Sequence, residues 1–143
     1  MSNDIVIRPA TADDAEVVYG FICELSHTSF DKEVFERIFV ENLSHTLYHY
    51  YVAEDEGKVT GFLSCHGQYL LHHNGLAYEL QEMYVDEAYR SHGVGKMMLD
   101  VLLNKIGGTY DVLEVTSNNM RKDAHRFYLN NGFLQTHLKF TRK

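Results

Sequence analysis

The chain has 143 residues, of which 45% are hydrophobic and 13% aromatic, and this composition predicts a single globular domain over residues 1–143. Its formal net charge of −7 argues against nucleic acid as a partner. No apolar run approaches the ~20 residues of a membrane span, and the N-terminus lacks a signal-peptide pattern. Cys23 and Cys65 lie far apart in apolar patterns, which predicts reduced thiols in a cytoplasmic protein.

Hydrophobic spacing and turn signals divide the chain into alternating strands and helices. In chain order, the predicted elements are a strand at 5–8, helices at about 11–25 and 31–43, strands at 49–53, 59–69 and 77–85, a helix at 96–105, a strand at 112–116, a short helix at 123–129 and a final strand at 133–141. The order β-α-α-β-β-β-α-β-α-β predicts a mixed α/β domain with helices on the faces of one sheet.

The most informative segment runs from Tyr89 to Lys96, between a predicted strand and a predicted helix. Gly93 and Gly95 let the backbone approach a ligand closely, and the first N–H groups of the helix carry a partial positive charge. Such a helix start binds phosphate or pyrophosphate, and Arg90 and Lys96 would add charge. The segment therefore indicates a nucleotide-type cofactor. The alternative is an ordinary strand-to-helix turn that needs glycine for its positive φ.

Two other glycine motifs do not fit this segment. A Walker loop needs four residues between its first glycine and a Gly-Lys-Ser/Thr, and that pattern is missing. A dinucleotide fingerprint needs a third glycine where this chain has Met98, and it belongs to an early β-α-β unit. A nucleoside diphosphate group other than NAD or ATP is therefore favoured.

The glycine loop and one later segment together resemble a known family. The loop reads Arg90-Ser91-His92-Gly93-Val94-Gly95 after a strand that ends Met83-Tyr84-Val85, and the later segment contains Asn119, Ala124 to Tyr128 and Gly132-Phe133. They are similar to the acetyl-CoA pyrophosphate loop of the GNAT superfamily of N-acetyltransferases and to its segment after the fifth strand. The resemblance implies a mainly antiparallel sheet and acetyl-CoA as the co-substrate. It implies cofactor contacts at Met83, Tyr84, Val85, Arg90, Ser91, His92, Gly93, Val94, Gly95, Lys96 and Asn119, with the backbone of Met83 and Val85 pairing with the pantetheine arm.

Further blocks extend the resemblance to one subfamily. They are Ile7 to Thr11, Ile22 to Leu25, Leu71 to His73, Glu79 to Glu82, Asp123 to Leu129 and Phe140-Thr141. These blocks resemble the aminoalkylphosphonate N-acetyltransferases, which acetylate the amino group of small aminophosphonates. The resemblance implies an acceptor of that kind.

Acetyl transfer to an amine requires a base, because an alkyl amine of pKa about 10 attacks only in its neutral form. Glu79 lies on the strand before the glycine loop, where family members often carry the base. Glu82 would face the opposite side of that strand if the strand is regular. We therefore predict Glu79 as the base and Glu82 as the second candidate. The alternative for either residue is a solvated strand carboxylate.

Two residues of the later segment acquire roles from the resemblance. Tyr128 occupies the position of the family's general acid, which protonates the departing CoA thiolate. The alternative for Tyr128 is a core tyrosine on the apolar face of its helix. Asn119 resembles a residue that hydrogen-bonds the CoA arm, and its alternative role is to cap the short helix.

The acceptor side is predicted from position alone. His66, His72 and His73 precede Glu79 in the chain and could bind a divalent metal ion, although adjacent histidines point in opposite directions in an extended chain. The same loop could instead bind the acceptor's anion through histidine N–H donors. The predicted substrate contacts are Glu24, His27, Phe30, His72, His73 and Glu82.

The predicted function is the transfer of acetyl from acetyl-CoA to the primary amine of an aminoalkylphosphonate. Direct attack is favoured, since Cys65 lacks the His-Asp spacing of an activated nucleophile. The alternatives are a different acceptor, such as a polyamine or a protein N-terminus, and a non-catalytic sensor that binds acyl-CoA. The acidic net charge would suit a polyamine. A homodimer is compatible with the superfamily resemblance, but the sequence shows no interface pattern.

Overall fold

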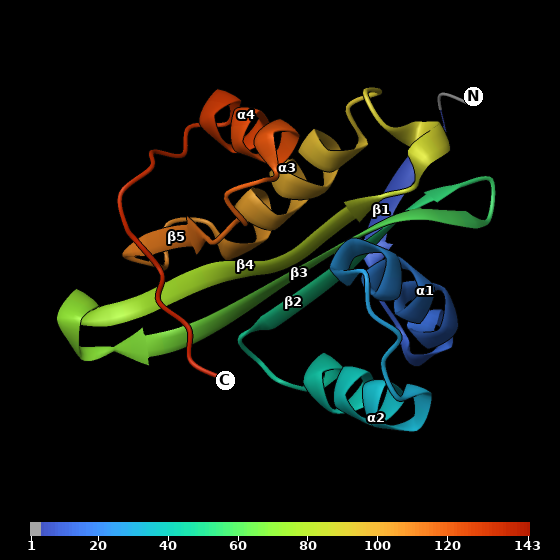
Figure 1. Ribbon diagram of the computed structural model, residues 1–143, viewed down its shortest axis with the longest axis horizontal. Helices are drawn as coiled ribbons and strands as arrows, with labels where there is room; N and C mark the ends of the chain where they lie inside the picture. The colour runs from blue at the N-terminus through green and yellow to red at the C-terminus, as the bar shows by residue number, and fades with distance from the viewer. Residues whose placement is uncertain (1–3) are drawn as a thin grey trace.

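The computed structural model describes residues 4–143, which form a five-stranded sheet covered by helices (Figure 1). The strands lie in the sheet in chain order and are β1 (Ile5–Pro9), β2 (Tyr48–Asp55), β3 (Lys58–Leu70), β4 (Gly75–Val85) and β5 (Val112–Val115). Strands β1 to β4 pair antiparallel, whereas β5 pairs parallel with β4. Within residues 4–143, every helix is too short or too polar to cross a bilayer.

The helices connect these strands in the predicted order. They are α1 (Ala15–Ser26), α2 (Lys32–Leu43), α3 (Val94–Ile106) and α4 (Lys122–Asn130), with short 3-10 turns η1 (Ala12–Asp14), η2 (Leu71–His73) and η3 (Glu87–Tyr89). Local signals explain their ends. The Asp31 carboxylate accepts a hydrogen bond from Val34 N at 3.0 Å and caps α2, and Gly107 ends α3 with φ +55°. The predicted order is confirmed through α4.

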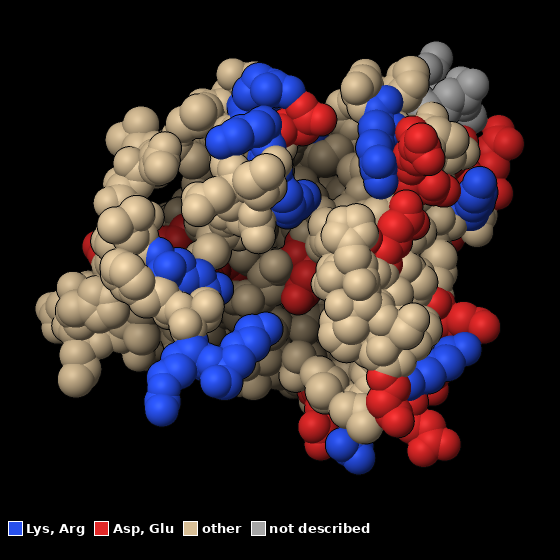
Figure 2. Space-filling view, in the orientation of Figure 1, with Lys and Arg blue, Asp and Glu red and all other residues tan. Residues whose placement is uncertain are grey.

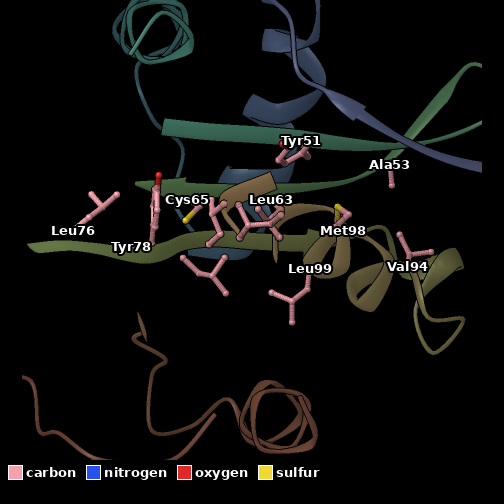
Figure 3. Close-up of a cluster of buried hydrophobic side chains, with 12 residues drawn as sticks. Tyr51, Ala53, Leu63, Cys65, Leu76, Tyr78, Val94, Met98 and Leu99 are labelled. Carbon is pink, nitrogen blue, oxygen red and sulfur yellow. The ribbon is translucent and has the colours of Figure 1, made fainter. Parts of the chain in front are cut away.

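Helices on the two faces of the sheet bury two separate cores. Helices α1 and α2 cover one face, and the buried residues there are Ala10, Ala15, Val18, Phe21, Ile22, Phe39, Val52, Phe62 and Tyr84. Helix α3 covers the other face, where Leu63, Cys65, Leu80, Met98, Leu99 and Leu102 are among the buried residues (Figure 3). Phe127 and Tyr128 of α4 pack against this second core. Because side chains alternate along a strand, neighbouring residues of β2, β3 and β4 contribute to opposite cores.

The predicted final strand at 133–141 is wrong, because residues 133–143 have no strand conformation. The segment leaves α4 and runs as a coil past β5 and across the sheet (Figure 1). Its apolar side chains alternate as in a strand, but Leu134, Leu138 and Phe140 are 81%, 82% and 88% exposed. A strand requires a paired edge, and within residues 4–143 no strand pairs with this segment.

The N-terminal strand is fixed to the rest of the domain by Arg8. Its guanidinium makes two hydrogen bonds of 2.9 Å to the buried Asp14 carboxylate and two of 3.3 Å to Glu54 on β2. Burial alone would raise the pKa of Asp14, but hydrogen bonds from Arg8 and from Thr11 N outweigh it and lower that pKa. The Arg8–Asp14 ion pair therefore stabilises the fold at every pH at which Asp14 is ionised.

We predict that Asp14→Asn lowers the free energy of unfolding at pH 7 by about 1–3 kcal/mol, because Arg8 loses a buried charged partner. Since the folded pKa lies below the unfolded value of about 3.9, the difference should shrink as the pH falls through the folded pKa. Urea denaturation at pH 7 and pH 3 measures this. Lys32→Ala, which removes the exposed pair with Glu16, is the control and should change stability by less than about 0.5 kcal/mol. Equal effects of the two substitutions would contradict the prediction.

Candidate active site

The glycine loop begins α3 as predicted. Residues 90–93 form turns, and α3 starts after Gly93, whose φ is +81°. The first hydrogen bond of the helix runs from Met97 N to Gly93 O at 3.0 Å, so the N–H groups of residues 94–96 have no acceptor within the helix. Ser91 has φ +64°, a conformation that glycine adopts at lower cost. The loop therefore directs backbone donors to the position where a pyrophosphate would bind.

Two basic side chains flank the loop in different ways. Arg90 Nε donates to the Val85 carbonyl at 2.8 Å, and its guanidinium lies 5.4 Å from the centre of the Tyr84 ring. Lys96 Nζ is paired with Asp100 at 2.8 Å on the exposed surface of α3, and His92 is exposed nearby in sequence. Arg90 is thus fixed at the end of β4, while Lys96 is held only by a surface pair that contributes little.

Strand β4 has an unpaired edge beside this loop. It pairs with β5 over four residues only, from Ala77 with Val112 to Leu80 with Val115. Beyond Leu80, residues 82–85 pair with β3 along one edge, and no strand of the described sheet lies along the other. The predicted cofactor residues Met83, Tyr84 and Val85 belong to this segment. An extended ligand can add to such an edge as a further strand.

A β-bulge in β4 overturns the expectation that Glu79 and Glu82 face opposite sides. The pairing changes register between Ser64 and Cys65 of β3, since Cys65 pairs with Leu80 and Ser64 pairs with Glu82. Gln81 is the extra residue, so Glu79 and Glu82 both lie on the face covered by α1 and α2. The packing agrees with this register, because Leu80 and Met83 contact the α3 core while Tyr84 is buried in the other.

The two carboxylates have different surroundings on that face. Glu79 Oε2 accepts a hydrogen bond of 3.1 Å from Thr116 Oγ1, just after β5, which places Glu79 where the β4–β5 pairing ends. Glu82 is enclosed more fully: its carboxylate accepts a hydrogen bond from the Ser64 hydroxyl, and its N–H donates to Ser64 Oγ at 3.0 Å. Burial raises the pKa of Glu82, and the Ser64 hydrogen bond lowers it by less. Both carboxylates therefore remain candidate bases on one face.

Tyr128 packs on the α3 side of the sheet, and Asn119 lies in the loop before α4. The Tyr128 ring packs between Phe127 and Phe133, with ring centres 5.5 and 5.6 Å away. Burial raises the pKa of its phenol, which keeps the hydroxyl protonated at neutral pH, as a general acid requires. Asn119 is exposed and does not cap α4, because the N-cap residue is Arg121 and no side chain caps it. The Asn118 side chain accepts from Met120 N at 2.9 Å in the turn before the helix. The cofactor role of Asn119 stays a prediction.

The predicted acceptor residues between α1 and α2 are brought only partly to the sheet. Glu24 of α1 accepts a hydrogen bond of 2.6 Å from the Tyr84 hydroxyl of β4, and so lies on the same face as Glu79 and Glu82. His27 ends α1 in a left-handed conformation and is exposed. Phe30, in the loop that follows, is 39% exposed, and its carbonyl accepts from Tyr19.

The three histidines predicted as metal ligands do not converge. His66 on β3 is stacked on Tyr48, with ring centres 3.7 Å apart, and is hydrogen-bonded to Tyr50. His72 and His73 lie beyond the end of β3, and His73 pairs with Asp111 at 2.7 Å. Because an extended strand advances about 3.3 Å per residue, roughly 15–20 Å of chain separates His73 from Glu79. In residues 4–143, no three His, Cys, Asp or Glu side chains are grouped to hold a metal ion, so His66, His72 and His73 do not form the predicted site, and His72 and His73 lie away from Glu79. A divalent metal ion stays a prediction.

A cavity of about 240 Å³ lies between α2 and the sheet, on the face that carries Glu82. Figure 2 shows that face hollowed between α1 and the C-terminal segment, with acidic atoms on its floor and basic side chains along its rim.

The residues on this face that the sequence did not predict are Asn42, Tyr50 and Ser64. Asn42 Nδ2 donates to Tyr50 Oη at 2.9 Å, and Tyr50 Oη lies 2.8 Å from His66 Nε2. If β2 and β3 paired regularly from the Glu56-Gly57 turn, Tyr50 would lie opposite Leu63. A bulge at Thr60 shifts the pairing by one residue, so Tyr50 lies opposite Ser64 instead.

This combination of a split β4–β5 pair, a glycine loop before α3 and carboxylates on β4 defines a class of enzyme. A profile of the acetyltransferase (GNAT) domain matches residues 46–135, and the chain belongs to this family. It is an acetyl-CoA-dependent N-acetyltransferase.

Individual relatives agree with this assignment. The chain is 36% identical over 139 residues to the aminoalkylphosphonate N-acetyltransferase of Salmonella typhimurium, and the match covers 95% of this chain and 89% of that protein. Among solved structures, a transcriptional regulator from Bacillus halodurans superposes with a TM-score of 0.87 at 20% identity, covering 97% of this chain and 99% of that one. An aminoglycoside N-acetyltransferase in complex with CoA superposes with a TM-score of 0.86 at 17% identity, covering 100% and 97%. These two structures confirm the predicted fold, a mainly antiparallel sheet flanked by helices.

We predict that Glu82→Gln stabilises the fold at neutral pH. The folded pKa of Glu82 lies above its ordinary value of 4.5, so the folded state holds the proton more strongly than the unfolded state does. The native Glu82 therefore costs stability as the pH rises from 4.5 through the folded pKa, by about 1.4 kcal/mol for each tenfold difference in proton affinity between the two states. Urea denaturation at pH 4, 6 and 8 should show the variant gaining on the wild type with pH. A difference that does not change with pH would contradict the burial of this charge.

Proposed function

We propose that residues 1–143 form a single cytoplasmic acetyltransferase domain that acetylates the primary amine of an aminoalkylphosphonate. The observation that carries this acceptor is the 36% identity, over 95% of the chain, to a protein of that name. Cys23 and Cys65 are free thiols, which is compatible with a reducing compartment.

In this proposal, acetyl-CoA binds along the free edge of β4. The N–H groups at the start of α3, from Val94 to Lys96, bind the pyrophosphate, and Arg90 neutralises its charge. The backbone of Met83 and Val85 pairs with the pantetheine arm, which leaves the thioester near the point where β4 and β5 separate.

The amine then attacks the thioester carbonyl directly. Glu79, beside Thr116 at the end of the β4–β5 pairing, takes the proton from the ammonium form of the acceptor, directly or through water. Tyr128 approaches from the α3 side and donates its proton to the departing thiolate. A covalent intermediate on Cys65 is disfavoured, because burial raises the pKa of this thiol to about 12 and keeps it protonated.

The function is tested by free-thiol release from acetyl-CoA with a panel of amines. Aminomethylphosphonate and 1-aminoethylphosphonate should be acetylated with a higher kcat/KM than spermidine, an amino-acid mixture or a peptide N-terminus. Turnover restricted to another amine would replace the acceptor and keep the chemistry. Binding of acetyl-CoA without turnover on the whole panel would favour a sensor.

The same assay tests the two catalytic residues. Tyr128→Phe and Glu79→Gln should each lower kcat by roughly 10²-fold or more while the affinity for CoA stays unchanged, because each removes one proton transfer. Tyr69→Phe, at a tyrosine that is 73% exposed, is the matched control and should keep full activity. Wild-type kcat in either active-site variant would show that its role is assigned wrongly.

One observation favours a polyamine as the second candidate acceptor. The cavity beside Gln81 is lined by Glu82 and by no lysine or arginine, so its charge suits a cation better than a phosphonate dianion. Spermidine in the panel decides between them.

We also propose that the enzyme is a homodimer joined through its C-terminal segment. Residues 134–143 carry a formal charge of +3 against −10 for the rest of the chain, and they expose Leu134, Leu138 and Phe140. Strand β5 is the edge of the sheet, so a second copy can add this segment beside it.

Removing residues 134–143 should therefore convert a dimer into a monomer of unchanged helix and strand content. Sedimentation equilibrium of the full chain and the truncated chain measures the mass, and circular dichroism checks the fold. Leu138→Asp with Phe140→Asp should have the same effect, because it buries two charges in the interface. A full-length monomer, or a truncated dimer, would rule out this assembly.

A further inference from the structure

The 240 Å³ cavity beside Glu82 contains groups that the proposed chemistry does not use. Its walls come from α1, α2 and strands β2 to β4, and the lining residues are Val18, Ile22, Phe35, Ile38, Phe39, Asn42, Tyr50, Phe62, His66, Gln81 and Glu82. At about 30 Å³ for each small molecular group, this volume accommodates roughly eight non-hydrogen atoms.

The polar wall of the cavity is ordered by a chain of hydrogen bonds. Burial raises the pKa of Tyr50 to about 12 and lowers that of His66, so both side chains are neutral at pH 7. Asn42 then donates to Tyr50 Oη, and Tyr50 Oη is hydrogen-bonded to His66 Nε2 at 2.8 Å. The polar groups of Asn42, Tyr50 and His66 thus satisfy one another, and Glu82 is the one ionisable acid in the lining.

The opposite wall is apolar and largely aromatic. Phe39 and Phe62 are buried, with ring centres 6.2 Å apart, and Phe35 and Ile38 extend the wall along α2. A single carboxylate facing aromatic rings suits an ammonium group and its alkyl chain. It disfavours an anion, since no lysine or arginine lies in the lining to balance a second negative charge.

The position of the cavity connects it to acetyl transfer. Gln81 and Glu82 follow directly after Leu80, the last residue of β4 that pairs with β5. Under the proposed function, the thioester lies at this point of separation. A molecule in the cavity would therefore extend its amine toward the thioester from the face that carries Glu79.

We infer that this cavity binds the carbon skeleton next to the amine of the acceptor, with the ammonium held by Glu82 and the alkyl group against Phe35, Ile38 and Phe39. The inference rests on the proposed function for the position of the thioester only. It makes the enzyme selective for small amines with a compact apolar group beside the amine, and it leaves any anionic end of the acceptor outside the cavity, toward the basic rim in Figure 2.

The test measures binding without turnover, using CoA-saturated protein and propylammonium chloride as the probe in isothermal titration calorimetry. Ile38→Trp places a bulky ring in the cavity from a position that is 49% exposed. Val40→Trp, 48% exposed on the same helix but outside the lining, is the matched control. We expect Ile38→Trp to weaken propylammonium binding at least tenfold and Val40→Trp to change it less than twofold. Equal affinities in the two variants would overturn the inference.

Two further arms keep the test independent of folding and of the acceptor's identity. Glu82→Gln fills the same volume without the charge, and it should also weaken propylammonium binding at least tenfold; unchanged binding would overturn the role of Glu82. Propylphosphonate has the same carbon chain with a negative end, and it should not displace propylammonium from the wild-type protein. If it does displace propylammonium, and Ile38→Trp abolishes that displacement, the cavity is an anion site instead. If wild-type protein binds propylammonium here but does not acetylate aminoalkylphosphonates, the proposed acceptor is wrong and the cavity assignment stands.

Discussion

Strand β4 contains one residue more than the facing length of β3, and the position of Gln81 as the extra residue determines where the acidic groups point. With a regular ladder, Glu82 would have entered the apolar core under α3, where an ionised carboxylate is costly. The bulge instead turns Glu82 to the side of α1 and α2, beside Ser64. The separation of β4 from β5 begins at the same residue, so the bulge lies where the proposed acceptor side and the proposed cofactor edge meet.

The sheet also separates the two residues proposed to transfer protons. Glu79 lies on the face covered by α1 and α2, and Tyr128 packs on the face covered by α3. In the proposed mechanism, the thioester at the edge of β4 would lie between them, so the proton would leave the amine on one side and reach the thiolate on the other. Glu79 is hydrogen-bonded to Thr116 near the end of β5, whereas burial keeps the Tyr128 phenol protonated.

Much of this arrangement could be predicted from the sequence, because local rules control it. The spacing of apolar residues predicts the helices and strands up to residue 130, and the glycine loop has the backbone geometry that its composition indicates. The errors come from pairing between distant residues. The bulges at Thr60 and Gln81 change which side chains share a face, and no residue within either strand signals them. The predicted convergence of the three histidines is not observed for a related reason. Strand β3 stays extended through Leu70, so His72 and His73 lie far from His66. The final segment has the alternation of a strand but no partner in the sheet that residues 4–143 form.

The five residues from Gln81 to Val85 have a further consequence. Gln81 and Glu82 line the cavity, Met83 and Val85 contact the α3 core, and Tyr84 is stacked on Phe21 with ring centres 4.7 Å apart. Since the backbone of the same segment is the edge proposed to bind the cofactor, a substitution at any of its positions would affect packing or the proposed binding. The opposite wall of the cavity is formed by α1 and α2, and these helices do not contribute to the proposed cofactor edge. Evolution of a new acceptor preference in this scaffold would therefore proceed through α1 and α2 while β4 stays fixed.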